Sequence, residues 1–354
     1  MSRNLNTDKI RAGITIGDIN GIGLEVIIKT LMDNRILQLC TPIVYGSSKV
    51  ASFHRKALGV SDFSFFPIRE ADQANPKNAN LVNCWEEEVA IELGKPSSIA
   101  GKYALKSLEA AINDIKRNKT DVLVTAPIDK QTIQSDKFNF PGHTEYLAEQ
   151  FQVKENLMLL VSDSLRVGVV TGHVPVNKIS SLLSTELIIK KIRILNKSLI
   201  EDFGIRKPKI AVLGLNPHAG DKGLIGDEEA KIIIPAINKA KEDNLLVFGP
   251  YPADGFFGSG NFKNFDGVLG MYHDQGLVPF KALSFGSGVN FTAGLPIVRT
   301  SPDHGTGYDI AGKNIASEDS FRQALYLACD IFKNRMEYKE LTSNPLKISI
   351  LKRE

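Results

Sequence analysis

An α/β fold with a mixed, largely parallel sheet is predicted from three features of the sequence. Short apolar segments rich in β-branched residues alternate with amphipathic helical segments nearly from end to end, as in parallel strands covered by helices. At 354 residues, the chain is long enough for two domains or for one large core with a split sheet. Two apolar runs within residues 157–172 are typical of strands joined by a turn at Asp163 and Ser164, so part of the sheet is expected to be antiparallel.

The individual elements follow from the same patterns. The expected strands are seven apolar runs, at 11–17, 42–46, 121–127, 167–172, 209–215, 245–250 and 266–272. The expected helices, in which apolar residues recur at helical spacing, cover 22–38, 101–118, 142–151, 185–203, 227–242 and 318–335. Residues 61–98 are polar and irregular, and this segment either separates two subdomains or forms an excursion from one of them.

The composition is that of an ordinary globular protein, with 43% hydrophobic and 23% charged residues. The formal net charge of +3 is small for this length, and Lys and Arg form no dense run with aromatic residues. A nucleic-acid partner is therefore not expected, whereas anionic small molecules remain candidates.

Cys40, Cys84 and Cys329 are odd in number and far apart, which favours a reducing cytoplasm over a disulfide scaffold. The sequence contains no apolar run of membrane-helix length and no signal-peptide core near its start, so a cytoplasmic location without a membrane partner is expected.

Three of the six histidines follow a short apolar strand. They are His173 in VGVVTGH, His218 in IAVLGLNPH and His273 in GVLGMYH. Because the carboxyl ends of parallel strands open onto one crevice, the three imidazole rings are expected to converge. Neutral imidazoles suit a divalent metal such as zinc, and three protein ligands leave one coordination position for substrate. No HExxH-like signature accompanies them, so the residues alone leave the metal site and a structural role equally open.

Three aspartates lie near these histidines in the sequence. Asp274 follows His273 directly, Asp254 ends another strand in GPYPAD, and Asp221 comes three residues after His218. Such carboxylates can bind the metal, orient a histidine or cap a helix. We expect Asp254 and Asp274 at the site and Asp221 as a helix cap.

Two other histidines have different surroundings. Gly142, His143 and Thr144 precede an amphipathic helix and offer a hydroxyl group and backbone N–H groups at its amino terminus, where an anion can bind. An ordinary Thr N-cap is the alternative. His54 lies in the middle of a helical segment, SSKVASFHRKALG, among basic neighbours, and is expected to be a solvated surface residue.

The glycine-rich loop GDINGIGLEV, residues 17–26, follows the first strand and opens a helix, as dinucleotide-binding loops do. It lacks the third glycine of GxGxxG, and no acidic residue ends a clear second strand at the expected place. A tight turn near an active-site crevice is sufficient to explain it.

Six blocks occur in order along the chain: FPGHTEYLAE, VTGHVPV, GLNPHAGDKGLIGDEE, GPYPAD, YHDQGLVPFK and GVNFTAGLPIVRTSPDHGTGYDIAG. Together they resemble the 4-hydroxythreonine-4-phosphate dehydrogenases of vitamin B6 (pyridoxine) biosynthesis, in a match that runs from about Arg11 to Phe332. The resemblance implies a fold like that of isocitrate and isopropylmalate dehydrogenases, with residues 1–354 forming two interleaved α/β subdomains around an active-site cleft. It also implies a homodimer with active sites at the subunit interface.

The resemblance assigns roles to individual residues. The implied metal ligands are His173, His218 and His273, of which one comes from the partner subunit; one arrangement takes His273 from one chain and the other two from its partner. The implied substrate contacts are His143, Thr144, Lys281, Asn290 and Arg299.

The block DHGTGYDIAGKNIA, residues 303–316, resembles the nucleotide loop that holds the adenosine part of NAD in isopropylmalate dehydrogenases, although alone it would be a glycine-rich surface loop. The cofactor contacts implied by this loop are His304, Gly305, Asp309 and Gly312. The first loop departs from the family pattern PGxPxGIGPE, because Ile16, Ile19 and Leu24 replace its prolines. The turn is expected to survive this change, and the contacts of this loop with substrate stay open.

The implied reaction oxidises the secondary alcohol of 4-phosphooxy-L-threonine with NAD or NADP, and loss of carbon dioxide then gives 3-amino-2-oxopropyl phosphate. A divalent metal (zinc, magnesium or cobalt) would stabilise the alkoxide and then accept electron density during decarboxylation. Asp254 and Asp274 would orient the metal site, and Lys281 would either pair with the phosphate or relay a proton. The alternatives are a dehydrogenase of 4-phospho-D-threonate or 4-phospho-D-erythronate and, from another class, a metal-dependent hydrolase, which would need no nucleotide loop.

Overall fold

The computed structural model describes residues 9–284 and 286–345, and its strands form one mixed sheet. The strands are β1 (Ile10–Thr15), β2 (Cys40–Gly46), β3 (Phe66–Ile68), β4 (Asn80–Asn83), β5 (Val122–Thr125), β6 (Leu157–Val161), β7 (Arg166–Thr171), β8 (Lys209–Leu213), β9 (Leu246–Tyr251), β10 (Gly267–Tyr272), β11 (Val289–Ala293) and β12 (Val298–Pro302). Their order is β3-β4-β2-β1-β5-β12-β11-β6-β7-β10-β8-β9. Within the described residues, the pairings of β6 with β7, β6 with β11 and β11 with β12 are antiparallel and the others are parallel. The predicted α/β class with a mixed, largely parallel sheet is confirmed.

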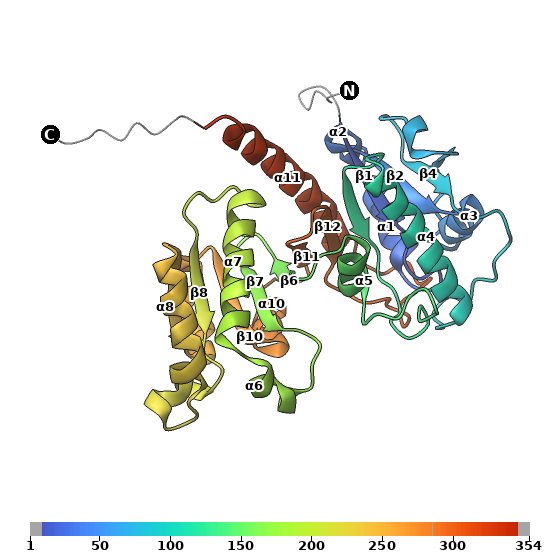
Figure 1. The fold of residues 1–354 in the computed structure, drawn as a ribbon. Helices are drawn as coiled ribbons and strands as arrows, with labels where there is room; N and C mark the ends of the chain where they lie inside the picture. Colours follow the sequence, from blue (N-terminus) through green and yellow to red (C-terminus); the bar gives the residue numbers. More distant parts are fainter. Residues whose placement is uncertain (1–8, 285, 346–354) are drawn as a thin grey trace.

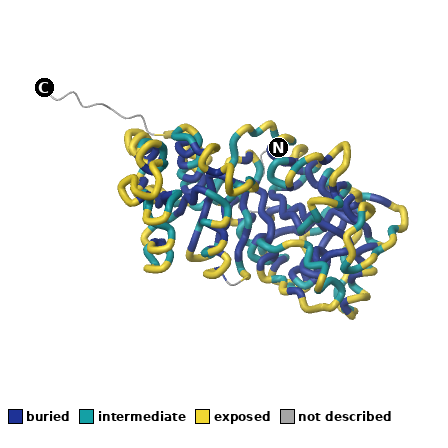
Figure 2. The backbone as a smooth tube through the Cα atoms, turned by 90° about the horizontal axis from the view of Figure 1, so that it is seen from below, coloured by how far each residue is buried: buried dark blue, intermediate teal, exposed yellow. Residues whose placement is uncertain are grey.

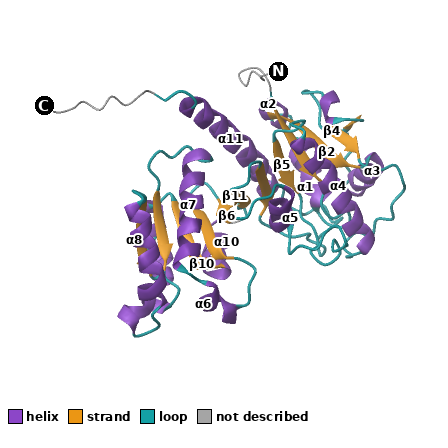
Figure 3. Cartoon of the chain, viewed as in Figure 1, coloured by secondary structure: helices purple, strands orange, loops and turns teal. Residues whose placement is uncertain are grey.

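Helices cover the sheet in two groups (Figures 1 and 3). The α-helices are α1 (Gly23–Leu31), α2 (Ile36–Leu39), α3 (Ser48–Ala57), α4 (Ser98–Lys116), α5 (His143–Gln150), α6 (Ile179–Leu182), α7 (Thr185–Glu201), α8 (Ile234–Glu242), α9 (Ala253–Gly258), α10 (His273–Ser284) and α11 (Asp319–Thr342). Short helical turns are η1 (Ala71–Gln73), η2 (Val176–Lys178), η3 (Pro217–Gly223), η4 (Glu229–Ile233) and η5 (Asn261–Asn264). One group of helices surrounds β1, β2 and β5, the other surrounds β7, β8 and β10, and α11 runs between them (Figures 1 and 3).

All seven expected strands are present, and the expected hairpin is formed by β6 and β7. The helix expected over 22–38 is interrupted, because α1 ends at Leu31 and the short α2 begins at Ile36. Asp33 turns the chain between them: its carbonyl accepts from the N–H of Ile36, and its carboxylate binds the guanidinium of Arg35.

The interior is apolar and continuous across much of the sheet (Figure 2). The prediction for His54 is wrong, because its side chain is buried on the inner face of α3 together with Val50 and Ala51. Its Nε2–H donates to the carbonyl oxygen of Ile19 at 2.8 Å, which ties α3 to the first loop.

The polar segment 61–98 extends the sheet rather than separating subdomains. It contributes β3 and β4, which pair in parallel with each other and continue the sheet beyond β2. The end of the segment contacts the first loop, since the backbone N–H of Gly94 donates to the carbonyl of Asn20 at 2.9 Å and the Asn20 amide donates to the carbonyl of Lys95 at 2.8 Å.

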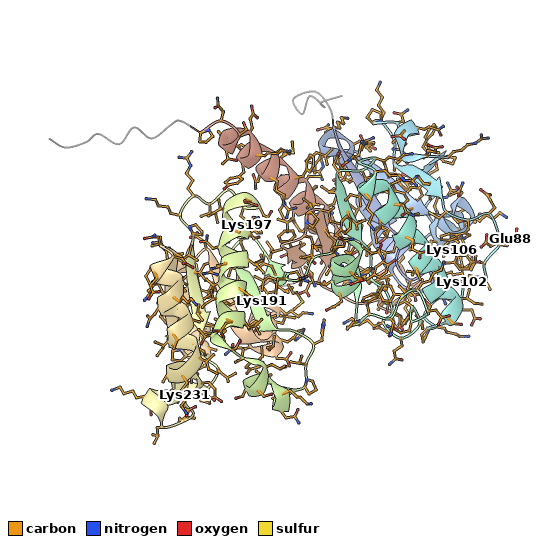
Figure 4. The ribbon with its side chains drawn as sticks, in the orientation of Figure 1. Glu88, Lys102, Lys106, Lys191, Lys197 and Lys231 are labelled. Carbon is orange, nitrogen blue, oxygen red and sulfur yellow. The ribbon has the colours of Figure 1, made fainter. Side chains whose placement is uncertain are left out.

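Charged side chains of both signs occupy the outer surface. Lys102 and Lys106 extend from α4, and Lys197 extends from α7 (Figure 4). Lys106 forms an ion pair with Glu87 at 2.5 Å. This mixture of signs agrees with the small net charge. Within the described residues, none of the helices has both the length and the apolar character needed to cross a membrane.

Candidate active site

A pocket of about 320 Å³ lies where β5, β11 and β12 meet the residues that follow β7 and β10. Nine residues predicted from the sequence line it: His143, Thr144, His173, His273, Lys281, Asn290, Arg299, His304 and Gly305. Segments that are far apart in the chain therefore meet here, as expected for a crevice at the strand ends of an α/β sheet.

Arg299, on β12, is the buried cation of the pocket. Its guanidinium donates to the hydroxyl oxygen of Thr125 at 2.8 and 3.2 Å and to that of Thr292 at 3.3 Å. Burial lowers the pKa of Arg299 to about 10, so the group stays protonated at neutral pH. Within residues 9–284 and 286–345, its hydrogen-bond partners are neutral hydroxyl groups, which leave the charge available to an anion.

Two uncharged polar atoms lie beside this cation. The side-chain Oδ1 of Asn290 and the Nε2 of His143 are buried, and neither has a hydrogen-bond partner within the described part of the chain. Burial, followed by the charges of Arg299 and Lys130, lowers the pKa of His143 well below its usual value, so this imidazole is neutral. Since buried polar atoms are nearly always paired in folded proteins, these two indicate a ligand.

The helix after His143 begins as the sequence indicated, with Gly142 as its N-cap. Gly142 provides no side chain, and Thr144 lies inside the first turn with its hydroxyl 3.4 Å from that of Thr292. Thr144 is therefore not an ordinary N-cap, and its hydroxyl lies near the partners of Arg299.

His173 and His273 approach each other because they follow neighbouring parallel strands, β7 and β10. Their ring centroids are 5.4 Å apart. Burial lowers the pKa of His173, which keeps that imidazole neutral. The Nδ1 of His273 lies 2.7 Å from a carboxylate oxygen of Asp274, and this contact leaves Nε2 available to a metal. The donor set fits a divalent metal, as two imidazoles of which one is oriented by a carboxylate.

His218 does not join this pair within one chain. It is exposed on η3, outside the pocket lining, and its backbone has a left-handed conformation with φ of 52°. In the part of the chain that the structure describes, no three His, Cys, Asp or Glu side chains gather closely enough to hold a metal ion. Within one chain, strand adjacency therefore groups His173 with His273 rather than with His218. That a third ligand comes from a partner subunit stays a prediction.

Of the two aspartates expected at the site, one lies beside His273 and the other lies near the His218 segment. Asp274 lies beside His273, whereas Asp254 is exposed on α9, which packs against the His218 segment. Asp221 does not cap a helix, because it lies in the left-handed stretch of η3.

Lys281 stands at the mouth of the pocket, where it forms an ion pair with Asp303 at 3.3 Å. Burial raises the pKa of Asp303, and the ammonium group of Lys281 opposes that shift. The neighbouring His304 has a buried Nε2 without a partner among the described residues. Asp309 and Gly312 lie farther along the same segment, outside the pocket lining, and Gly312 has φ of +77°.

The altered first loop keeps its turn. Ile16, Ile19 and Leu24 are each buried in the core. The loop backbone reaches the proposed nucleotide segment, since the N–H of Ile22 donates to the carbonyl of Thr306 at 2.9 Å. A Cβ on Gly21 would lie 2.6 Å from that same carbonyl oxygen, so only glycine allows this approach.

Among the pocket residues that sequence reasoning missed are Thr125, Lys130, Glu145 and Asp303. Thr125 ends β5 and Lys130 follows it, so the strand-end argument used for the histidines would have found both had it been applied to that strand. Glu145 is the second residue after His143 and Asp303 directly precedes His304, so each is a neighbour of a predicted residue.

Comparison with known proteins adds independent findings. A family model described as pyridoxal phosphate biosynthetic protein PdxA matches residues 38–328. A 4-hydroxythreonine-4-phosphate dehydrogenase of Bacteroides thetaiotaomicron is 55% identical over 344 residues, which cover 97% of this chain and 94% of that protein. A protein of Oceanobacillus iheyensis, provisionally named D-threonate 4-phosphate dehydrogenase, is 40% identical to this chain. The match covers 90% of this chain and 97% of that protein.

Solved structures agree with these relatives. The crystal structure of a 4-hydroxythreonine-4-phosphate dehydrogenase from Klebsiella pneumoniae superposes with a TM-score of 0.80 at 32% identity, covering 92% of this chain and 98% of the other. An isocitrate dehydrogenase from Methylococcus capsulatus is only 12% identical and superposes with a TM-score of 0.51. The match covers 94% of this chain and 89% of the isocitrate dehydrogenase chain. That likeness concerns the fold alone, and it confirms the predicted resemblance to isocitrate dehydrogenases.

Proposed function

This chain belongs to the PdxA family of pyridoxal phosphate biosynthetic proteins, and on that premise we propose that it oxidises 4-phosphooxy-L-threonine with NAD and decarboxylates the product. Its relatives are named as dehydrogenases, so the chain is an oxidoreductase. The hydride and a proton leave the secondary alcohol, and the resulting β-keto acid loses carbon dioxide to give 3-amino-2-oxopropyl phosphate. The names of these relatives give no support to a metal-dependent hydrolase.

The observation that carries the proposal is the buried guanidinium of Arg299 beside two converging histidines. A guanidinium whose protein partners are hydroxyl groups suits a phosphate dianion through charge-assisted hydrogen bonds. The amide of Asn290 and the ammonium group of Lys281 would add contacts to the same phosphate. His143 and Thr144 would orient the rest of the substrate from the first turn of α5.

His173 and His273 would hold a divalent metal, whether zinc, magnesium or cobalt, with Asp274 orienting His273. When bound, the metal would lower the pKa of the substrate hydroxyl group and polarise the ketone during loss of carbon dioxide. NAD or NADP would accept the hydride, with its adenosine part on the segment that contains His304, Gly305, Asp309 and Gly312.

We propose a homodimer in which His218 of a second copy completes the histidine site. Val176 and Leu224 are 80% and 81% exposed, and they lie on segments joined by the hydrogen bond from Ser180 to Glu228 at 2.7 Å. Exposed apolar side chains beside a predicted ligand are expected at a subunit interface. The two halves of the sheet would then act as subdomains, in a protein that works in the cytoplasm.

A related substrate is the second candidate, because one relative carries the name of a D-threonate 4-phosphate dehydrogenase. The test is a substrate panel with purified, metal-loaded protein, in which NADH formation is followed by absorbance. We expect the highest kcat/KM with 4-phosphooxy-L-threonine and loss of turnover after chelation, restored by added metal. Full activity of the chelated protein would contradict the metal-assisted reaction, and turnover of 4-phospho-D-threonate alone would select the second candidate.

A further inference from the structure

The two candidate substrates differ at a single position. In 4-phospho-D-threonate, a hydroxyl group replaces the amine that 4-phosphooxy-L-threonine carries at C2. At neutral pH, that amine is an ammonium group, which needs an anionic or strongly polar acceptor when it leaves water. A pocket that selects the amino acid therefore needs an acceptor that is free to receive it, and a carboxylate is the acceptor that also attracts its charge.

The lining of the pocket contains two carboxylates, Glu145 and Asp303, among three cationic side chains and several histidines. Asp303 is engaged, because it forms the ion pair with Lys281 at 3.3 Å. Asp274, outside the lining, is engaged with His273 at 2.7 Å. Neither group can accept a substrate ammonium without losing its present partner.

Glu145 is different. It is half-buried in the first turn of α5, two residues after His143, and within residues 9–284 and 286–345 no hydrogen bond or ion pair engages its carboxylate. Glu145 lines the same pocket as Arg299 and His173, and its negative charge opposes the lowering of both pKa values by burial, so it lies within electrostatic reach of the phosphate and metal halves of the pocket. In the substrate, C2 is bonded directly to C3, the carbon that is oxidised, on the side away from the phosphate-bearing C4, so the C2 ammonium group must lie close to the metal half of the pocket.

We propose that Glu145 is the specificity-determining residue that receives the C2 ammonium group and so selects amino acid substrates over 2-hydroxy acids. This inference rests on the proposed function of the same site. A carboxylate attracts the ammonium group at short range, whereas it repels the more anionic hydroxy acid. The charge of Glu145 therefore favours binding of the amino acid and disfavours binding of the hydroxy acid.

A simpler role for Glu145 is to stabilise the amino terminus of α5 through the helix dipole. That role concerns the protein alone and is the same for both substrates. The ratio of kcat/KM for the amino acid to that for the hydroxy acid therefore separates the two roles.

The experiment compares wild-type protein with Glu145→Gln on 4-phosphooxy-L-threonine and on 4-phospho-D-threonate. Glu149→Gln is the matched control, because Glu149 is exposed one turn later on the same helix. A lost charge-assisted hydrogen bond predicts a fall in kcat/KM of about 10- to 150-fold for the amino acid in Glu145→Gln. For the hydroxy acid, we expect little change or a gain. The Glu149→Gln protein should behave as wild type with both substrates.

Equal losses with both substrates, or no loss with either, would overturn the inference while leaving the proposed function in place. Glu145→Asp keeps the charge and should keep the preference for the amino acid, which provides the test if Glu145→Gln does not fold. Wild-type protein that oxidises neither compound would instead refute the proposed function, and the inference with it.

Discussion

Arg299 keeps a positive charge inside the protein without a carboxylate partner among the described residues. Thr125 and Thr292 come from the strands on either side of β12, so the sheet itself fixes the guanidinium. Burying a charge without a hydrogen-bonded carboxylate costs free energy, which is visible in the lowered pKa of this arginine. A bound phosphate would offset that cost, and substrate affinity would then depend on this one side chain.

Replacing Arg299 with alanine tests this dependence. We expect a loss of about 2 to 4 kcal/mol in kcat/KM for the phosphorylated substrate, because one buried partner of the phosphate is removed. Free 4-hydroxythreonine should be a poor substrate of the wild type and should lose far less in the variant. Steady-state kinetics with both compounds measures the difference. Equal losses would place Arg299 outside the phosphate site.

His54 makes stability depend on pH. Burial lowers its pKa to about 4 from an ordinary value of 6.5, so the unfolded chain binds a proton that the folded chain resists. As pH falls from about 6.5 towards 4, the protein should lose up to about 1.4 kcal/mol per pH unit from this group; above pH 6.5 the group contributes no such change. Urea unfolding at several pH values, compared between wild type and His54→Gln, isolates the effect. Identical pH slopes in the two proteins would contradict it.

The loop that carries His218 is held by one buried carboxylate. Glu229 accepts from the backbone N–H groups of Leu215 and Asn216 at 2.7 Å each and from the Asn216 amide at 2.9 Å. Five successive residues from His218 to Lys222 have positive φ, an arrangement that persists only when surrounding contacts enforce it. Glu229 provides such contacts, so it determines where His218 is presented.

Glu229→Gln should therefore destabilise the protein by about 1 to 3 kcal/mol, because a charged acceptor of three hydrogen bonds is lost. Asp227→Asn is the matched control, since Asp227 is an exposed acid two residues earlier that pairs only with Lys231 among the described residues. That change should stay within about 0.5 kcal/mol. Urea denaturation measures both, and indistinguishable midpoints would argue against the anchoring role of Glu229.

Elements with a plain apolar pattern were predictable from sequence, whereas three elements that carry site residues, β11, β12 and α10, were not. Strands β11 and β12 escaped prediction because Asn290 and Arg299 occupy strand positions where a core residue would be expected. Helix α10 was missed because Gly276 and Pro279 both lie inside it. The packing of α10 against β7 requires a glycine at position 276, since a Cβ there would lie 2.8 Å from the side chain of Val167.

The site residues show the same limit. Strand-end histidines were recognisable, and the structure brings His173 and His273 together as expected. The burial of His54 was hidden, because its basic neighbours in the sequence face away from the core while it faces inward. The Glu145 carboxylate gave no separate signal, since its significance depends on which other acids already have partners.

At the scale of the whole molecule, the active site divides into two parts. His173, His273 and Arg299 line one pocket, whereas His218 lies outside it on a loop beside exposed apolar residues. Because a two-fold interface presents the same surface on both subunits, a copy that offers His218 to its partner also receives the partner's loop. Each dimer would then contain two equivalent sites, each built from both chains.

Mixed dimers test this division directly. In a heterodimer of His218→Ala and His273→Ala chains, one site keeps all three histidines and the other loses two of them. Heterodimers purified through two different affinity tags should therefore recover about half of the wild-type activity, although each parent protein is inactive.

The matched control pairs His173→Ala with His273→Ala. Because these two residues share one chain's pocket, each site of that heterodimer lacks a histidine and activity should not return. Recovery in the control instead of the test pair would show that His173 and His273 serve different sites, and the same absence of activity in both would indicate that each site is built from a single chain.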